Sequence, residues 1–381
     1  MNTSFDVIVI GVGSMGSSAS YHLAARGYKV LGLEQFDITH ELGSHAGQSR
    51  IIRKAYFEHP DYVPLLTRAY EGWKDFEEET GTQLYYRTGL LYSGKSGNEI
   101  IRGVKQSASL YNIPVENINF PEKRFTQFKI PADYETLFEP DAGFVTPERA
   151  IRLYAQQAVK KAAKIHISEK VIEWKKEGPG IKVVTDKNKY NCSKLIITAG
   201  AWSAKLIPAL TGKIKVTRQF VAWVKPKHPD EFKLGKFPCW MIADDIRPGA
   251  YYGFPVLPCD TFGEPAGLKL AYHYPGIVTE PDKVNRQTIS EDIEDLKYAL
   301  QKYLPGTFDS FISTKICLYA NSPDENFIID KLPGEENIVI ACGFSGHGFK
   351  FIPVVGEILA DLAIEGKTQQ PINFLRAERF F

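Results

Sequence analysis

Apolar runs and glycine-rich turns alternate at the start of the chain. Residues 5–36 (FDVIVIGVGSMGSSASYHLAARGYKVLGLEQF) contain an apolar run, a glycine turn, a stretch with helical spacing and a second apolar run. This order predicts a buried strand, a turn, a helix that stops at Gly27 and a second strand that ends at Glu34. We therefore expect a strand–helix–strand unit at the amino terminus.

The glycines of this unit have the spacing Gly11-x-Gly13-x-x-Gly16. A glycine at each position permits a tight turn, close approach of a pyrophosphate to the backbone, and close contact between helix and strand. Glu34 lies 23 residues beyond Gly11, where a carboxylate can accept hydrogen bonds from an adenosine ribose. The unit predicts a dinucleotide site; the alternative is a strand–helix unit whose glycines serve packing alone.

Strand and helix patterns return later in the chain. Thr146 and Pro147 suit the N-cap and first position of a helix, because proline lacks an amide hydrogen that the first turn would leave unpaired. Other patterns predict a hairpin-like pair of strands, a buried strand that enters a helix through Gly200, and a last strand, glycine turn and helix, at residues 171–190, 194–206 and 336–367.

The segments between these units are rich in aromatic residues and prolines and show few helical patterns, which indicates antiparallel strands. We expect an α/β fold (α+β overall), with a Rossmann-type FAD-binding domain interleaved with a mostly antiparallel-sheet substrate domain. The predicted ranges are 1–84, 146–214 and 318–381 for the first domain, and 85–145 and 215–317 for the second.

Composition narrows the function classes. The chain has 381 residues and a formal net charge of +1, so it is long enough to enclose a large cofactor, and no nucleic-acid partner is predicted. Its five cysteines are widely spaced and include no CxxC pair, so neither a disulfide framework nor a metal site is expected. Since the first residues resemble neither a signal peptide nor a membrane span, we expect a cytoplasmic protein without a membrane partner.

The segment after the second strand separates FAD from NAD. Residues 40–56 (HELGSHAGQSRIIRKAY) are dense in Gly, Ser, His and Arg, where an NAD dehydrogenase would normally continue strand by helix. A polar loop beside the nucleotide site suits a longer dinucleotide and favours FAD. The same loop supplies His45, Arg50 and Arg53; the two arginines would face a common site if the stretch were helical.

Two strand-like stretches carry further candidate groups. In residues 268–273 (LKLAYH) alternation places Lys269, Ala271 and His273 on one face, where Ala271 leaves a gap between two basic groups. The alternative is a solvated edge strand. In the stretch that begins at Lys315, Cys317 shares a face with polar neighbours, although a lone strand cysteine is more often a small core residue.

The amino-terminal glycine unit and five further motifs together carry a resemblance that runs almost end to end. The chain resembles the monomeric sarcosine oxidase and N-methyltryptophan oxidase family, with its pipecolate oxidase relatives. The motifs are GSHAGQSRIIRKAY, YYGFP, LKLAYH, CLYANSPDENFIID and GFSGHGFKF, at residues 43–56, 251–255, 268–273, 317–330 and 343–351. The resemblance implies an FAD-dependent oxidase of N-methyl or cyclic secondary α-amino acids, with sarcosine the first candidate. The products are an imine, then glycine and formaldehyde, and hydrogen peroxide.

The resemblance also implies roles for individual residues. Cys317 would carry FAD covalently through the 8α-methyl group of the isoalloxazine ring. Lys269 would stand over flavin N5 through a water, where its positive charge would assist oxygen reduction. Arg53 with Lys350 would bind the substrate carboxylate. Tyr319 is a further candidate for the substrate pocket. The remaining catalytic candidates are His273, Arg50, Tyr252 and His45.

The predicted cofactor-binding residues come from the glycine turn, the polar loop and the last glycine-rich turn. They are Gly11, Gly13, Ser14, Met15, Gly16, Glu34, Gln35, Ser44, Ser49, Arg50, Gly200, Gly346, Gly348, Phe349 and Lys350. The family often has two consecutive histidines where this chain has His45 followed by Ala46, which leaves the role of His45 open.

Other functions remain compatible with the sequence. N-methyl-L-tryptophan and L-pipecolate are alternative substrates, because the sequence does not define the shape of the pocket lid expected at residues 240–255. An NAD dehydrogenase fits the first glycine motif alone. A flavin dehydrogenase would pass electrons to an acceptor other than oxygen, and a flavin-binding sensor would lack turnover. We expect a monomer whose partners are an amino-acid substrate and oxygen.

Overall fold

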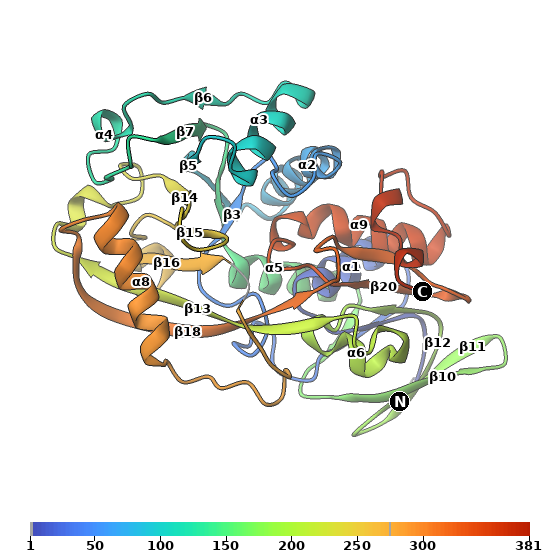
Figure 1. The fold of residues 1–381 in the computed structure, drawn as a ribbon. Coiled ribbons are helices and arrows are strands. Elements are labelled where there is room, and N and C mark those ends of the chain that lie inside the picture. Colours follow the sequence, from blue (N-terminus) through green and yellow to red (C-terminus); the bar gives the residue numbers. More distant parts are fainter. Residues whose placement is uncertain (1–2, 274–275) are drawn as a thin grey trace.

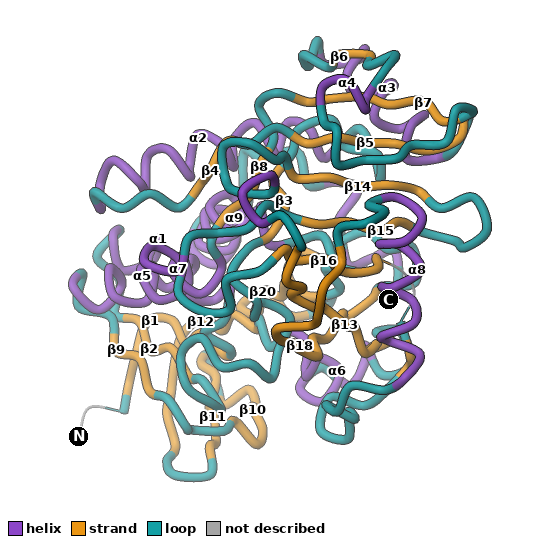
Figure 2. Tube along the Cα trace, turned by 90° about the vertical axis from the view of Figure 1, so that its left-hand side faces the viewer, coloured by secondary structure: helices purple, strands orange, loops and turns teal. Residues whose placement is uncertain are grey.

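An eight-stranded sheet and a nine-stranded sheet form the frame of the molecule in this computed structural model, which describes residues 3–273 and 276–381 (Figure 1). Figure 2 shows the strands β1, β2 and β9 of the first sheet far from β5, β6 and β7 of the second. Both sheets are built from segments that are distant in the sequence.

The first sheet centres on β1 (Ser4–Ile10), which pairs in parallel with β2 (Val30–Leu33) and β12 (Lys189–Ile197). Their apolar runs are buried on both faces, as parallel strands require. The predicted hairpin and the predicted return of residues 194–199 to this sheet are confirmed. The other members are β9 (Lys164–His166), β10 (Val171–Glu177), β11 (Gly180–Thr185), β19 (Ile328–Leu332) and β20 (Glu335–Cys342).

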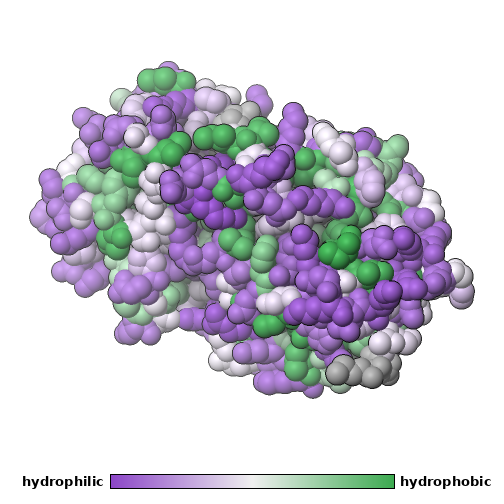
Figure 3. Space-filling view, turned by 90° about the horizontal axis from the view of Figure 1, so that it is seen from below, coloured by the Kyte–Doolittle hydropathy of each residue, from purple (hydrophilic) through white to green (hydrophobic). Residues whose placement is uncertain are grey.

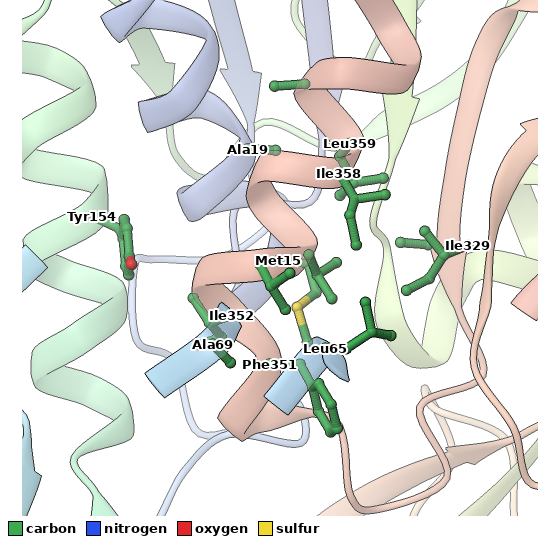
Figure 4. Packing of buried hydrophobic residues seen from close by; sticks show 14 of the residues in the cluster. Met15, Ala19, Leu65, Ala69, Tyr154, Ile329, Phe351, Ile352, Ile358 and Leu359 are labelled. Carbon is green, nitrogen blue, oxygen red and sulfur yellow. The ribbon is translucent and has the colours of Figure 1, made fainter. Parts of the chain in front are cut away.

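Helices pack against one another beside this sheet (Figure 1). The predicted helices are confirmed as α1 (Ser14–Ala25), α5 (Pro147–Lys160), for which Thr146 is the N-cap, and α9 (Ile352–Ile364). Figure 4 shows their core, where Met15 and Ala19 of α1 lie close to Ile358 and Leu359 of α9. This packing fixes the amino-terminal end of α1 against the end of β1.

The second sheet is mostly antiparallel, as expected, although β5 and β14 run in parallel. Its longest pair is β13 (Lys215–Pro226) with β18 (Phe308–Asn321), which carries Cys317. The other strands are β5 (Leu90–Lys95), β6 (Glu116–Asn117), β7 (Tyr134–Glu139), β14 (Cys239–Ala243), β15 (Ala250–Gly253), β16 (Leu268–His273) and β17 (Ile277–Val278). The domain division given above stays a prediction.

A small third sheet corrects the expectation for the arginine loop. Arg50–Ile52 forms strand β3, which pairs with β8 (Gly143–Val145), and β8 also pairs with β4 (Tyr85–Arg87). The stretch is therefore not helical: the β-branched Ile51 and Ile52 favour an extended backbone. Arg50 and Arg53 are not one helical turn apart.

Three long helices were not predicted: α2 (Tyr62–Thr80), α3 (Glu99–Tyr111) and α8 (Ser290–Tyr303). The signals were present, since Asn98 caps α3 by accepting from Ile100 N–H, and the buried residues Leu296, Leu300 and Tyr303 of α8 have helical spacing. Conversely, the helix expected after Gly200 is only α6 (Ser203–Leu206), preceded by one 3₁₀ turn. Two further short helices are α4 (Pro121–Arg124) and α7 (Cys259–Phe262).

The face in Figure 3 is mostly polar, with apolar residues in small scattered groups. Within residues 3–273 and 276–381, every helix is too short or too polar to cross a bilayer.

Candidate functional site

A cavity of about 410 Å³ lies at the carboxyl ends of the central parallel strands. Ile10 ends β1, Leu33 ends β2 and Thr198 follows β12, and all three line it. The carboxyl edge of a parallel sheet is where such folds bind nucleotides. The lining continues through residues 43–45 and 343–346, so the cavity extends from the glycine turn toward the second sheet.

The glycine turn leaves space on its cavity side and packs tightly on its inner side. A Cβ at Gly11 would lie 2.6 Å from the carbonyl oxygen of Thr198, and one at Gly16 would lie 1.9 Å from that of Gly11. A Cβ at Gly13 would meet no atom of the described residues within 4 Å. The open side of Gly13 faces the amino-terminal end of α1, where partial positive charge favours a pyrophosphate. The turn therefore fits a dinucleotide.

Glu34 occupies the position that an adenosine ribose requires. Its Oε2 accepts from Val12 N–H at 2.9 Å and its Oε1 from Phe36 N–H at 3.0 Å, which fixes the carboxylate at the cavity edge. Burial raises the pKa of Glu34, and the Phe36 and Val12 amides oppose this rise. A ribose without a 2′-phosphate matches an acid at this position.

Most of the predicted cofactor residues line the cavity, and three lie outside its described lining. Gly16 faces inward, Ser49 contacts Lys269, and Lys350 lies in a second pocket. Sequence reasoning missed several lining residues. Thr198 and Ala199 could have been found, because they end a strand that was correctly returned to the sheet; residues 170–172 and Trp202 gave no signal.

A second pocket of about 70 Å³ adjoins the first cavity, and both are lined by Arg50, Tyr319, Gly346 and Phe349. It brings together groups that are far apart in the sequence. From the predicted set these are Arg50, Arg53, Tyr252, His273, Cys317, Tyr319 and Lys350; the residues not predicted include Glu58, Gln219, Met241 and His347.

Arg53 is buried in this pocket and already paired. Its Nη2 donates to both carboxylate oxygens of Glu58, at 2.6 and 2.7 Å, and its guanidinium lies 4.2 Å from the ring centres of Tyr56 and Phe57. Burial alone would raise the pKa of Glu58, but Arg53 and its other basic neighbours lower it to about 2. Glu58 is thus a partly buried anion beside the basic pair.

Lys350 faces the same pocket. Its Nζ donates to the carbonyl oxygen of His347 at 2.6 Å and to the hydroxyl of Tyr56 at 3.4 Å. Burial and then Arg53 lower the pKa of Lys350 to about 7, against the opposing effect of Glu58. Because two acceptors face a group with three N–H bonds, one donor is left for an anionic ligand.

Cys317 lines the second pocket from β18. Its Sγ lies 3.5 Å from the carbonyl oxygen of Ala46 and 4.0 Å from Nη2 of Arg50. On the same strand, Tyr319 places its hydroxyl 3.1 Å from Nδ1 of His273. Burial lowers the pKa of His273 to about 4, so this imidazole is neutral at pH 7. Tyr252 forms another wall of the pocket.

His45 lines the first cavity, not the second pocket. Burial and then His40 lower the pKa of His45 to about 4, and its buried Nε2 has no hydrogen-bond partner among the described residues. An orphaned polar atom on the wall of a cavity is available to a ligand there.

Lys269 lies outside the described lining of both spaces, but it is close to Arg50, which lines both. Its Nζ donates to the carbonyl oxygens of Gly47 and Ser49, at 2.5 and 2.6 Å, and to Ser49 Oγ at 3.1 Å. The alternative of a solvated edge-strand lysine is wrong, since the side chain is buried between Trp223 and Phe254.

The sheet, the glycine turn and the elongated cavity define a dinucleotide-binding oxidoreductase fold. Residues 6–362 match the model of the FAD dependent oxidoreductase (DAO) family, and the chain belongs to this family. The resemblance noted from the motifs is confirmed as well.

Curated relatives cover the whole chain. A monomeric sarcosine oxidase of Streptomyces avermitilis is 37% identical over 100% of this chain and 98% of its own length. One of Bacillus sp. (strain B-0618) is 38% identical over 100% and 97%. An N-methyl-L-tryptophan oxidase of Salmonella gallinarum is 32% identical over 99% of both.

Two solved structures share the fold. The open form of NikD, described as an unusual amino acid oxidase, has a TM-score of 0.85 at 24% identity and covers 98% of each chain. L-proline dehydrogenase from P. horikoshii has a TM-score of 0.84 at 24% identity, covering 100% of this chain and 98% of its own. At this identity the likeness bears on the fold alone.

Proposed function

We propose that the protein is an FAD-dependent oxidase of N-methyl or cyclic secondary α-amino acids, with sarcosine as the first candidate substrate. The observation that carries this proposal is the second pocket, where Lys350 and Arg53 lie next to the cofactor cavity. A carboxylate bound there would hold an amino acid against the flavin end of the cavity. The sarcosine oxidase relatives support the same substrate class.

The pocket groups would bind and orient the substrate. Lys350 has a donor for the carboxylate, and Arg53 adds positive charge although Glu58 shares its guanidinium. Positive charge at the carboxylate end disfavours a second cation, so the substrate amine is favoured in its neutral form. Tyr252, Tyr319 and neutral His273 bound the space around the amine.

The cofactor residues would hold FAD between Glu34 at the ribose end and Arg50 at the second pocket. When bound, FAD supplies the acceptor for the two electrons that leave the substrate as a hydride equivalent. We also propose that Cys317 binds it covalently, because this thiol lines the second pocket close to Arg50, which lines both spaces. A monomeric, cytoplasmic enzyme belongs to the same proposal, supported by relatives named monomeric.

The overall reaction for sarcosine consumes one O₂ and one water. It yields glycine, formaldehyde and hydrogen peroxide: the substrate loses a hydride equivalent from C–H and a proton from N–H, and oxygen takes up these two protons and two electrons. Water then hydrolyses the imine. The positive charge of Lys269 would favour electron transfer to oxygen.

The test is a substrate panel for the purified protein. Sarcosine, N-methyl-L-tryptophan, L-pipecolate and L-proline are compared for kcat/KM and for peroxide formed per substrate consumed. We expect sarcosine to lead, because the second pocket has a volume of only about 70 Å³. A preference for N-methyl-L-tryptophan would change the assigned substrate from sarcosine to that amino acid. Substrate consumption without peroxide would indicate an electron acceptor other than oxygen. No turnover of any substrate on the panel would overturn the proposal.

A further inference from the structure

The peptide group that joins Gly47 to Gln48 lies between the partly buried carboxylate of Glu148 and the buried amino group of Lys269. Its carbonyl oxygen accepts from Lys269 Nζ at 2.5 Å, and its N–H, that of Gln48, donates to Glu148 Oε2 at 3.2 Å. The preceding N–H, that of Gly47, donates to Glu148 Oε1 at 2.5 Å. Glu148 and Lys269 are therefore joined through one backbone segment.

The backbone here is held in an uncommon conformation. Gly47 has φ +118° and Gln48, which is not a glycine, has φ +64°. Two consecutive N–H groups converge on one carboxylate, an arrangement typical of anion-binding backbone concavities. The Gln48 side chain is fixed too, since Trp223 Nε1 donates to its Oε1 at 2.8 Å. A left-handed residue of this kind persists only where its surroundings hold it.

Glu148 reaches this segment from a distant part of the chain. It follows Thr146 and Pro147 in the first turn of α5, and its carboxylate accepts from the 47–48 segment. Burial alone would raise the pKa of Glu148, but the Gly47 amide and then the nearby basic groups hold it below its usual value. Glu148 is therefore an anion at neutral pH.

The groups around Lys269 act on its pKa in opposite directions. Burial and then Arg50 lower the pKa of Lys269 well below its usual value, whereas Glu148 acts to raise it. The thiols of Cys317 and Cys239 also face it and act in the same direction as Glu148. His45 faces Glu148 from the other side. Removing the Glu148 charge would leave Lys269 beside Arg50 with less compensation.

We propose that Glu148 is a positioning residue for the oxygen step: through the 47–48 peptide it fixes the Lys269 ammonium in place and sustains its positive charge. This inference rests on the proposed use of Lys269 in oxygen reduction. In that step O₂ gains two electrons from reduced FAD and two protons, and leaves as hydrogen peroxide. Glu148 takes no part in the transfer itself.

The test uses the FAD-loaded protein reduced with dithionite, so that no amino-acid substrate is needed. The reduced protein is mixed with oxygenated buffer from about pH 6 to about pH 10, and reoxidation is followed by flavin absorbance. For Glu148→Gln we expect the pH above which the reoxidation rate falls to be about one unit lower than in the wild type. At alkaline pH the variant should therefore reoxidise about tenfold more slowly than the wild type. Lys269→Met should be slow at every pH.

The double variant E148Q/K269M decides whether the two residues act together. We expect it to be no slower than K269M, since Glu148 acts through Lys269. Additive losses, or wild-type reoxidation by E148Q at every pH, would overturn the inference. If E148Q folds poorly, Glu148→Asp keeps the charge and should keep the wild-type pH profile; a shifted profile in E148D would also overturn it.

Hydrogen–deuterium exchange gives a readout apart from catalysis. The amides of residues 45–49 should exchange faster in E148Q than in the wild type. Glu77→Gln is the matched control, because Glu77 accepts from two consecutive amides, Leu84 N–H at 2.5 Å and Tyr85 N–H at 2.6 Å, away from both pockets. In E77Q, amide exchange at residues 45–49 and the rate of flavin reoxidation should both be unchanged.

The proposed function is tested separately by anaerobic reduction with N-methyl amino acids. If they fail to reduce the flavin, the substrate assignment fails, while the dithionite experiment still decides the role of Glu148.

Discussion

Buried Arg53 and partly buried Glu58 form an ion pair in the second pocket, with Nη2 2.6 and 2.7 Å from the two carboxylate oxygens. The guanidinium is thereby shared before any substrate binds. Lys350, which contacts only neutral acceptors among its recorded hydrogen bonds, is then the more available cation for a carboxylate. Substrate affinity should follow the charge of Lys350.

Carboxylate binding should therefore weaken as the pH rises through about 7, the pKa to which burial lowers Lys350. The ammonium is present below this pH and is lost above it, so the Kd of propionate should be flat on the acid side. On the alkaline side it should rise about tenfold per pH unit. The Kd is measured by titrating the protein with propionate and following the flavin absorbance.

Lys350→Gln should bind propionate weakly and with little dependence on pH. Lys283→Gln, which alters an exposed lysine paired with Glu280, is the control and should match the wild type. An unchanged pH profile in K350Q would show that another group titrates.

Lys269→Met should slow flavin reoxidation far more than flavin reduction. Loss of a positioned charge in a buried site costs about 10²- to 10³-fold in rate, whereas the substrate carboxylate is held elsewhere. Stopped-flow measurement of the two half-reactions separates them, with Lys225→Met, an exposed lysine, as control. Equal slowing of both half-reactions would count against the role of Lys269.

Acid precipitation should leave the yellow colour in the protein pellet of the wild type. In Cys317→Ser the colour should move to the supernatant, because a hydroxyl is a much weaker nucleophile than a thiolate. Cys259→Ser, at an exposed thiol far from both pockets, should behave as the wild type. Colour in the wild-type supernatant alone would leave FAD bound and refute the covalent link.

Two glycines of the same turn should respond differently to alanine. Gly16→Ala would place a Cβ 1.9 Å from a backbone oxygen and should destabilise the protein by roughly 1–3 kcal/mol. Gly13→Ala meets no described protein atom, so the apoprotein should keep its stability within about 0.5 kcal/mol.

Gly13→Ala, which should leave stability nearly unchanged, should affect FAD binding. The Gly13→Ala methyl group would enter the space for the pyrophosphate and should weaken FAD binding, measured by fluorescence titration of the apoprotein. Tight FAD binding by G13A would mean that the pyrophosphate lies elsewhere in the cavity.

Local patterns predicted the nucleotide half of the fold because its elements are specified by short-range features. The strand, glycine turn and helix around Gly11–Gly16 follow from spacing and backbone freedom, and Thr146 with Pro147 marked the start of α5. Local patterns left a helix open at Arg50–Ile52, and pairing with β8 decided for a strand. Sequence reasoning missed α3 and α8, whose signals lie among aromatic strands.

Residue identity alone determined that this chain carries a dinucleotide turn, an acid for the ribose, and basic groups suited to a carboxylate. Tertiary structure decided which of these groups meet. Glu58, His347 and Glu148 have no local signal, because their importance comes from the partners that the fold brings to them: Arg53, Lys350 and Lys269. Electrostatic interaction depends on distance and burial, and both are properties of the folded chain.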